Sequence, residues 1–373
     1  MTTLLITEKG DIVKALNAFL AGLLRKGIVA AVMAPMRVSA GDAVFPALVA
    51  DPDKLQADPF APVLPVSEAQ MVSRMTVDGP VSKPVAVVMR NCQIRALTEL
   101  IKLKQAYADN LYIIGVDCAG TFALSDYKEL TAQKDSGSLY KELIQGEKAL
   151  TRKLRSACTT CVDPIPDSCD LVIGAYGVDL DKGLLLYPRT DRGKELLKGI
   201  DTGSGQDGTS REKAVNEVRK AHAAADEAFR QEHASVRGID EVLALYSTCI
   251  NCQNCRRVCP ICYCQECFFV SDNLKQTGDG MIKKSRARGA FKMPVDTLLF
   301  HTGRMNHMIL SCVECGLCEQ ACPSNIQLMK VLKRVAHDAQ KKFEYKAGRN
   351  PEEEIPLMYY REDEFTEVGG KHD

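Results

Sequence analysis

The sequence predicts two kinds of domain in one chain: an α/β N-terminal domain with a mainly parallel sheet, followed by a helix-rich two-cluster ferredoxin-like domain. Strand-like and helix-like segments alternate through the first part of the chain, as they do in parallel sheets. Two copies of one cysteine motif then follow in the C-terminal part. A length of 373 residues suits two or three domains.

The elements of the first domain follow from apolar spacing. Residues 11–26 show helical spacing, with Asp11 as N-cap and Gly27 as the stop. Short β-branched or apolar runs predict strands at 28–35, 85–89, 111–116 and 171–175, and a helix is expected over 93–108. Residues 41–66 predict loop with short strands.

The cysteine motif appears at Cys249-Ile-Asn-Cys252-Gln-Asn-Cys255-Arg-Arg-Val-Cys259-Pro260 and again at Cys312-Val-Glu-Cys315-Gly-Leu-Cys318-Glu-Gln-Ala-Cys322-Pro323. This is the C-x2-C-x2-C-x3-C-P spacing of bacterial ferredoxins, in which the fourth cysteine ligates the other cluster. We therefore expect one 4Fe–4S cluster on Cys249, Cys252, Cys255 and Cys322 (cluster one). A second would lie on Cys312, Cys315, Cys318 and Cys259 (cluster two).

Crossed ligation of this kind places two clusters roughly 10–12 Å apart, which suits transfer of single electrons. The alternative is a pair of structural zinc sites with four cysteines each. Two complete copies with the C-x3-C-P ending disfavour zinc.

A third group of cysteines lies in the α/β half. Cys92 and Cys118 directly follow two successive predicted strands, and the carboxyl ends of parallel strands face one crevice. Cys158-Thr-Thr-Cys161 adds a C-x2-C pair. We expect a third 4Fe–4S cluster on Cys92, Cys118, Cys158 and Cys161 (cluster three). The alternative is that Cys92 and Cys118 are small buried hydrophobic residues.

Four further cysteines exceed what three clusters need. Cys169 precedes a predicted strand and is expected in the core. Cys262, Cys264 and Cys267 form a C-x-C-x2-C run, which we interpret as packing near the clusters rather than as another metal site. Sixteen cysteines in a chain with no visible signal peptide favour metal over disulfides.

Several motifs of the N-terminal half resemble one family, the beta subunits of deazaflavin-coenzyme-dependent hydrogenase and formate dehydrogenase. They are Arg90-Asn-Cys92-Gln-Ile-Arg-Ala, Gly115-Val-Asp-Cys118-Ala-Gly-Thr, Cys158-Thr-Thr-Cys161-Val-Asp163, Cys169-Asp-Leu-Val-Ile-Gly174-Ala-Tyr-Gly177 and Pro188-Arg-Thr-Asp-Arg-Gly193. The resemblance covers about residues 10–200. The later segment resembles the fused ferredoxin module of the formate dehydrogenase members.

The resemblance implies an FAD that exchanges hydride with a reduced deazaflavin, and a cluster that takes single electrons from it. It also implies partners: a hydrogenase or formate dehydrogenase catalytic subunit, or a heterodisulfide-reductase-like flavoprotein, in a hetero-oligomer. The four cysteines of cluster three fall on the family's cluster positions. Where the family carries Gly-Gly-x-Val-Thr, this chain reads Lys9-Gly10-Asp11-Ile12-Val13, so no residue is assigned to the flavin.

The remaining segments complete the expected domains: 1–200 α/β, 201–245 linker and charged helix, 246–342 helical ferredoxin domain, and 343–373 polar tail. The charged helix, about 211–234, is expected to face solvent, and the tail to lie on a partner or be partly disordered. Helices are expected at 295–310 and 327–342. His301 and His307 are expected on a helix face rather than as ligands, and the basic run 283–288 could dock an acidic partner or be a solvated loop.

The net charge and the apolar runs of the chain exclude some classes of function. A net charge of zero gives no support for a nucleic-acid or membrane surface, and no apolar run reaches about 18 residues. We expect a cytoplasmic electron-transfer subunit of an anaerobic oxidoreductase. The alternative is an enzyme that oxidises or reduces a deazaflavin, or NAD(P)H, at a bound FAD. A redox sensor is disfavoured because no effector domain is visible.

Overall fold

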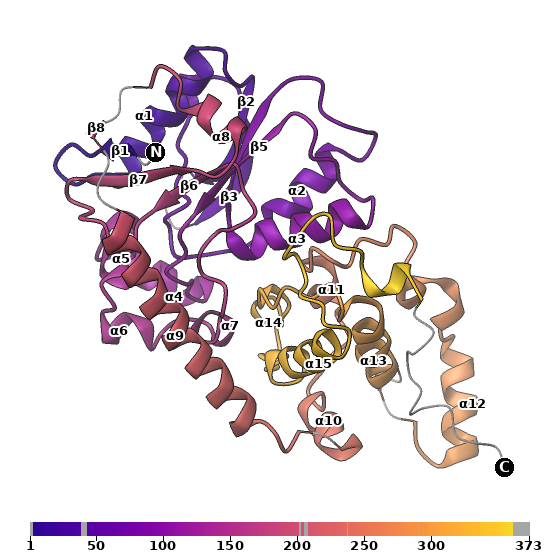
Figure 1. Ribbon diagram of the computed structural model, residues 1–373. Coiled ribbons are helices and arrows are strands. Elements are labelled where there is room, and N and C mark those ends of the chain that lie inside the picture. The colour runs from indigo at the N-terminus through magenta and orange to yellow at the C-terminus, as the bar shows by residue number, and fades with distance from the viewer. Residues whose placement is uncertain are drawn as a thin grey trace.

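The computed structural model describes residues 3–38, 43–200, 203–204, 208–236, 238–291, 293–294 and 296–360. Its N-terminal half is built on one sheet with the order β3-β2-β4-β5-β6-β7-β1-β8 (Figure 1). The strands are β1 Thr3–Ile6, β2 Ala31–Arg37, β3 Val44–Val49, β4 Val85–Arg90, β5 Leu111–Val116, β6 Leu171–Gly174, β7 Gly183–Pro188 and β8 Gly203–Ser204.

Four adjacent strands, β2, β4, β5 and β6, form a parallel centre, and antiparallel strands flank it on both sides. The predicted α/β fold is therefore confirmed, although the sequence did not indicate β1, β7 or β8. Because β8 pairs with β1, residues 203–204 belong to the sheet and not to the expected linker. The other linker residues from 201 to 207 lie outside the described residues.

Both faces of the sheet are covered, which explains why its central strands are apolar throughout. On β4, Ala86 and Val88 point into one core, whereas Val85, Val87 and Met89 point into the other. The helices of the N-terminal half are α1 Ile12–Arg25, α2 Glu68–Met75, α3 Asn91–Lys102, α4 Leu124–Thr131, α5 Ser136–Ile144, α6 Lys148–Thr151, α7 Ser156–Thr159 and α8 Asp191–Leu196.

The α1 helix begins as predicted, with the Asp11 side chain accepting a hydrogen bond from the Lys14 N–H. The α3 helix is shorter than the expected 93–108. It ends at Lys102, because Lys104 adopts the left-handed conformation (φ 57°) and stops the helix.

The C-terminal part is helical, as predicted, and packs against the face of the sheet that carries α2 and α3 (Figure 1). One apolar core joins residues of β4, α3 and the cysteine motifs. The helices of this part are α9 Gly208–Glu232, α10 Ile239–Leu245, α11 Asn254–Arg257, α12 Gly278–Arg288, α13 Thr297–Met308, α14 Leu317–Gln320 and α15 Met329–Lys342. Its short 3-10 turns are η2 Phe268–Val270, η3 Asp272–Leu274 and η4 Pro356–Met358, whereas η1 Pro52–Lys54 lies in the N-terminal half.

Two expectations about this part are wrong. The charged helix α9 does not simply face solvent, because its Arg211, His222 and Asp226 contact the sheet edge, the Cys161 loop and α15. The segment after Lys342 is also packed. The Tyr345 ring is buried, and its hydroxyl donates to the buried Glu99 carboxylate on α3. Residues 361–373 of the expected tail lie outside the described residues.

None of the helices in the described part of the chain combines the length and apolarity needed to cross a membrane.

Candidate metal centres

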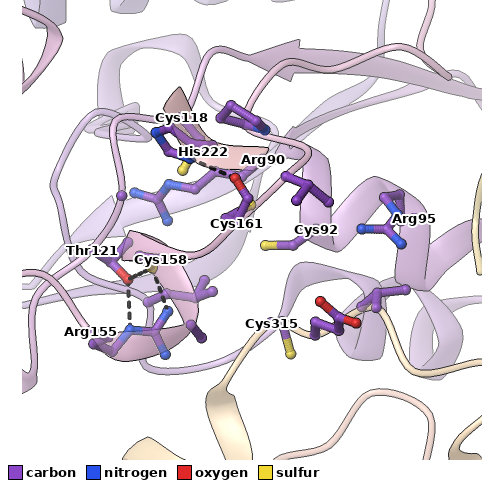
Figure 2. Close-up of a pocket in the computed structure, with 17 residues that line it drawn as sticks. Arg90, Cys92, Arg95, Cys118, Thr121, Arg155, Cys158, Cys161, His222 and Cys315 are labelled. Atoms are coloured by element: carbon purple, nitrogen blue, oxygen red, sulfur yellow. Dashed lines mark hydrogen bonds between the residues drawn. The ribbon is translucent and has the colours of Figure 1, made fainter. Parts of the chain in front are cut away.

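The four cysteines assigned to cluster three lie around one cavity (Figure 2). Cys92 lies in the first turn of α3 after β4, and Cys118 follows β5. Their strands are parallel neighbours, so both residues reach the same edge of the sheet, as the sequence predicted. Cys158 on α7 and Cys161 shortly after it line the same cavity. The cavity volume is about 40 Å³.

Basic and polar groups surround these thiols. Arg155 donates to the Thr121 hydroxyl at 2.8 Å and lies 3.6 Å from the Cys158 sulfur. Burial opposes ionisation of Cys158, but Arg155 and the Thr121 hydroxyl outweigh it and lower the pKa of this thiol. Burial raises the pKa of Cys161 to about 12. His222 Nδ1 lies 2.6 Å from the Cys161 carbonyl oxygen and so closes one side of the cavity.

Cys315, which the sequence assigns to cluster two, also lines this cavity. Figure 2 shows it approaching from a different part of the chain than the other four cysteines. The motif that would hold cluster two is therefore packed directly on the site proposed for cluster three. No sequence pattern indicates this contact, because more than 150 residues separate Cys158 from Cys315.

The two ferredoxin motifs repeat in conformation as well as in sequence. In the first copy, Asn251 and Gln253 have positive φ values of 53° and 60°. In the second, Glu314 and Gly316 occupy the same places in the motif, with values of 58° and 70°. Each copy then enters a short helix, α11 or α14, and these two helices contact each other.

Thiols of one motif influence the ionisation of thiols in the other motif. Burial raises the pKa of Cys249, and the thiolates of Cys322 and Cys252 add to this shift. Burial raises the pKa of Cys315 to about 12, with Cys259 as the next cause that raises it. Cys322 therefore lies near the first motif and Cys259 near the second, whereas the ligand sets themselves stay a prediction.

The structure also places the four cysteines and two histidines that the sequence analysis left outside the cluster sites. Cys169 is buried in the core, as expected. Cys262 and Cys267 are half-buried and pack near the motifs, whereas Cys264 is exposed.

His301 is buried, with Nε2 3.4 Å from the Cys249 sulfur, and its ring stacks on Tyr246 at a centroid distance of 3.9 Å. Burial and the nearby Arg304 lower the pKa of His301 to about 4. His307 is exposed, and so are most residues of the basic run on α12.

The donor sets fit cubane clusters in two respects. Thiolates are the ligands of such clusters, and each thiolate binds a different iron. In addition, guanidinium groups near the thiols keep buried donors without a partner among the described residues: Arg155 Nη1 at the cavity, and Arg304 Nε and Nη2 beside the paired motifs. Within the described residues, no three His, Cys, Asp or Glu side chains meet as ligands around a single metal ion would. Neither Arg155 nor Arg304 was predictable from the sequence, because isolated arginines follow no motif.

Two family models match consecutive parts of the chain. The model for the C-terminal part of the coenzyme F420 hydrogenase/dehydrogenase beta subunit matches residues 82–205, and the 4Fe-4S dicluster domain matches residues 210–326. Together with the fold and the cysteine sets, they define an iron–sulfur electron-transfer protein. More particularly, the chain is similar to the F420 hydrogenase/formate dehydrogenase beta subunit family, with a 4Fe-4S dicluster domain in its C-terminal part.

Individual proteins are also similar to this chain. It is 28% identical over 383 residues to the F420-dependent formate dehydrogenase 1 subunit beta of Methanococcus maripaludis, covering 93% of each chain. It is 27% identical over 304 residues to the F420-dependent formate dehydrogenase subunit beta of Methanocaldococcus jannaschii, covering 73% of this chain and 74% of the relative. A chain of the F420-reducing [NiFe] hydrogenase complex from Methanosarcina barkeri aligns with a TM-score of 0.44 at 16% identity, covering 60% of this chain and 86% of that one.

Proposed function

We propose that this chain relays single electrons through three 4Fe–4S clusters between redox partners. Cluster one is held by Cys249, Cys252, Cys255 and Cys322, and cluster two by Cys312, Cys315, Cys318 and Cys259. Cluster three is held by Cys92, Cys118, Cys158 and Cys161. The family and the dicluster domain support the class of protein, and the cavity in Figure 2 supports cluster three.

The observation that carries the relay is the position of Cys315. It lines the cavity formed by Cys92, Cys118, Cys158 and Cys161, so a ligand of cluster two would lie beside cluster three. The crossed motifs bring clusters one and two together in the same way. The clusters then follow one another in the order three, two, one, and an electron can cross the chain by short steps.

The outer end of this relay is cluster one. Cys252 is the exposed member among its cysteines, whereas Cys312, Cys318 and Cys259 of cluster two are buried. The basic helix α12 belongs to the same C-terminal part. We propose that a redox subunit with an acidic surface docks here, because opposite charges speed association and orient the partners.

The relatives indicate which partners to test. Both are named as beta subunits of F420-dependent formate dehydrogenases. A formate dehydrogenase or hydrogenase catalytic subunit, or a heterodisulfide-reductase-like flavoprotein, is the proposed partner in a hetero-oligomer. Co-purification of the chain from its native source tests this assignment, and recovery as a free monomer without redox subunits would contradict it.

The relay itself is tested by electron paramagnetic resonance of the reduced protein. Magnetic interaction is expected between cluster three and cluster two, in addition to that between clusters one and two. Cys161→Ser should remove the first interaction and keep the second, whereas Cys169→Ser, at a buried cysteine outside all three sets, should change neither. Isolated signals without any interaction in the wild type would contradict the proposed order.

A second candidate function is oxidation or reduction of a deazaflavin, or of NAD(P)H, at a bound FAD. A cavity of about 500 Å³ favours it, because it is lined by the Lys9–Val13 stretch that stands where the family carries its glycine motif. The side chains of Lys14, Arg37 and Lys141 also line it, beside the Asp11 and Asp135 carboxylates that cap α1 and α5. Basic side chains suit the phosphates of a dinucleotide.

The chain's own residues connect this cavity to cluster three. Ser138 and Lys141 of α5 line the cavity, while Tyr140 of the same helix donates to the Asp117 carbonyl at 2.7 Å, next to Cys118. A flavin here would lie one helix away from cluster three. When bound, FAD would take a hydride from the reduced coenzyme and release electrons singly.

The two candidates differ in a simple measurement. Yellow FAD released by acid from anaerobically purified protein supports the second candidate, and its loss in Lys141→Gln but not in Lys134→Gln places it in this cavity. Lys134 is a suitable control because it pairs with Glu142 near the same helix but does not line the cavity. Broad absorption near about 400 nm without extractable flavin supports the relay alone.

A further inference from the structure

Arg304, in the middle of α13, is a charged side chain that the fold buries almost completely. Only 3% of its surface is exposed. Its Nε and Nη2 atoms are buried and have no hydrogen-bond partner among the described residues. An unpaired guanidinium in such a place would cost several kcal/mol, so a negative group is needed beside it.

Four thiols lie near this guanidinium, together with Tyr246 and His301. Burial opposes the charge of Arg304, but the thiolates of Cys318, Cys259, Cys262 and Cys255, in this order, raise its pKa. Geometry agrees with this placement, because His301, one turn before Arg304 on α13, has its Nε2 atom 3.4 Å from the Cys249 sulfur. The guanidinium therefore lies among cysteines of both ferredoxin motifs.

The proposed ligand sets place Arg304 between clusters one and two. Cys255 belongs to proposed cluster one, and Cys259 and Cys318 belong to proposed cluster two. Arg304 is thus placed next to both members of the pair. The groups that act on the cysteines of cluster three are instead Arg155 and Arg90.

We propose that Arg304 is a positioning residue that supplies a fixed positive charge between clusters one and two and thereby favours their reduced states. The proposal rests on the relay function above. Reduction adds one electron, and one negative charge, to a cluster without any bond being made or broken. In a buried site a nearby cation stabilises the more negative state more strongly than the oxidised one.

The test is a redox titration followed by electron paramagnetic resonance, with dithionite as reductant, on the full chain. Arg304→Gln should lower the ratio of reduced to oxidised cluster at a fixed potential by about tenfold for the pair, which equals about 59 mV for one electron. Arg304→Lys, which keeps the charge, should recover most of this ratio. Cluster three should titrate as in the wild type in both variants.

A matched control distinguishes the loss of a positive charge near the clusters from the loss of a buried cation elsewhere in the fold. Lys102 is also buried, but it pairs with Glu99 on α3 and contacts Tyr345 instead of thiols. Lys102→Gln should leave all cluster potentials unchanged. Iron content, measured for every variant, shows that the clusters are still assembled.

The potentials and the cluster content of the Arg304 variants decide whether the proposal holds. Unchanged potentials of the pair in a fully assembled Arg304→Gln variant, or an equal shift of cluster three, would overturn the proposal. If Arg304→Gln does not assemble, Arg304→Lys decides: assembly with nearly wild-type potentials supports the proposal, and failure to assemble overturns it. A wild-type protein without reducible clusters would instead contradict the relay function itself.

Discussion

Gly316 lies directly against Ala157: a Cβ atom added to Gly316 would stand 2.4 Å from the Ala157 Cβ. Gly316 belongs to the second ferredoxin motif, and Ala157 directly precedes Cys158 of cluster three. The two cysteine loops are therefore in contact without space for even one methyl group. The Ser156 hydroxyl, which donates to the Glu319 carboxylate, ties the same loops together.

Gly316→Ala should separate these loops. Gly316 has a φ of 70°, where a side chain costs about 1–2 kcal/mol, and the clash with Ala157 should add about 1–3 kcal/mol of overpacking. We expect a lower temperature of anaerobic unfolding and a weaker magnetic interaction between clusters two and three.

Gly289→Ala is the control for Gly316→Ala. Gly289 has a similar φ of 75°, but nothing lies within 4 Å of its added Cβ. It carries the backbone strain without the clash. Equal effects of both substitutions on the magnetic interaction would contradict the role of the Gly316–Ala157 contact.

Arg211→Met should destabilise the junction of the sheet with α9. The Asp117 side chain is fully buried, and Arg211 reaches it with two hydrogen bonds of 2.6 and 2.9 Å. Removing the cation leaves a buried carboxylate next to Cys118 without its partner, which costs about 3–5 kcal/mol. The free energy of unfolding of the anaerobic protein measures this.

Arg219→Met provides the comparison on the same helix. Arg219 pairs with Asp167 at 3.0 Å, but both side chains are about half exposed, at 44% and 57%. Exposed ion pairs contribute only about 0–1 kcal/mol. If Arg219→Met lowered the free energy of unfolding as much as Arg211→Met does, burial would not be what makes the Arg211–Asp117 pair important.

Glu68 should make stability depend on pH. Burial raises the pKa of this carboxyl group from 4.5 to about 7, despite the charge of Arg90. Between these values the folded state binds more protons than the unfolded state, so stability falls as pH rises through this window, by about 3 kcal/mol. Glu68→Gln should be the more stable protein at about pH 8 and lose this advantage towards about pH 5.

Unfolding temperatures of wild type and Glu68→Gln across this range test the prediction. Glu217→Gln, on the exposed part of α9, removes a carboxylate without burial and should track the wild type. If the unfolding temperatures of Glu68→Gln and wild type differed by the same amount at every pH, ionisation of Glu68 would not contribute to the pH dependence of stability.

Cluster one should be the first to be lost under oxygen or an iron chelator. Its proposed ligand Cys252 is exposed, whereas three of the four ligands of cluster two are buried. An intermediate with about eight irons should appear, and its reduced spectrum should keep the interaction between clusters two and three. Early loss of that interaction would contradict the proposed order of the clusters along the chain.

Spacing in the sequence predicted the dicluster domain, and the placement of Cys92 and Cys118 after parallel strands predicted that they line one cavity. Both depend on local rules, the cysteine spacing and the geometry of a parallel sheet. Those rules say nothing about which distant surfaces pack together. The position of Cys315 beside the cysteines proposed for cluster three is therefore seen only in the structure.

Polar segments were the other source of error. The stretch after Lys342 is rich in charge, but Tyr345 and Ile355 are buried, and Tyr345 reaches Glu99 on α3. Lys333 of α15 is likewise buried and holds Asp226 of α9 and Glu314 of the second motif. Composition predicts exposure for such residues, whereas specific partners far away in sequence decide their burial.

The most direct test of the relay is the analysis of iron, zinc and acid-labile sulfide in protein purified without oxygen. Three clusters predict about twelve irons and about twelve sulfides per chain, with about four fewer irons in Cys255→Ser and in Cys161→Ser and no loss in Cys169→Ser. Zinc with hardly any iron or sulfide, or an unchanged iron content in Cys161→Ser, would contradict the account.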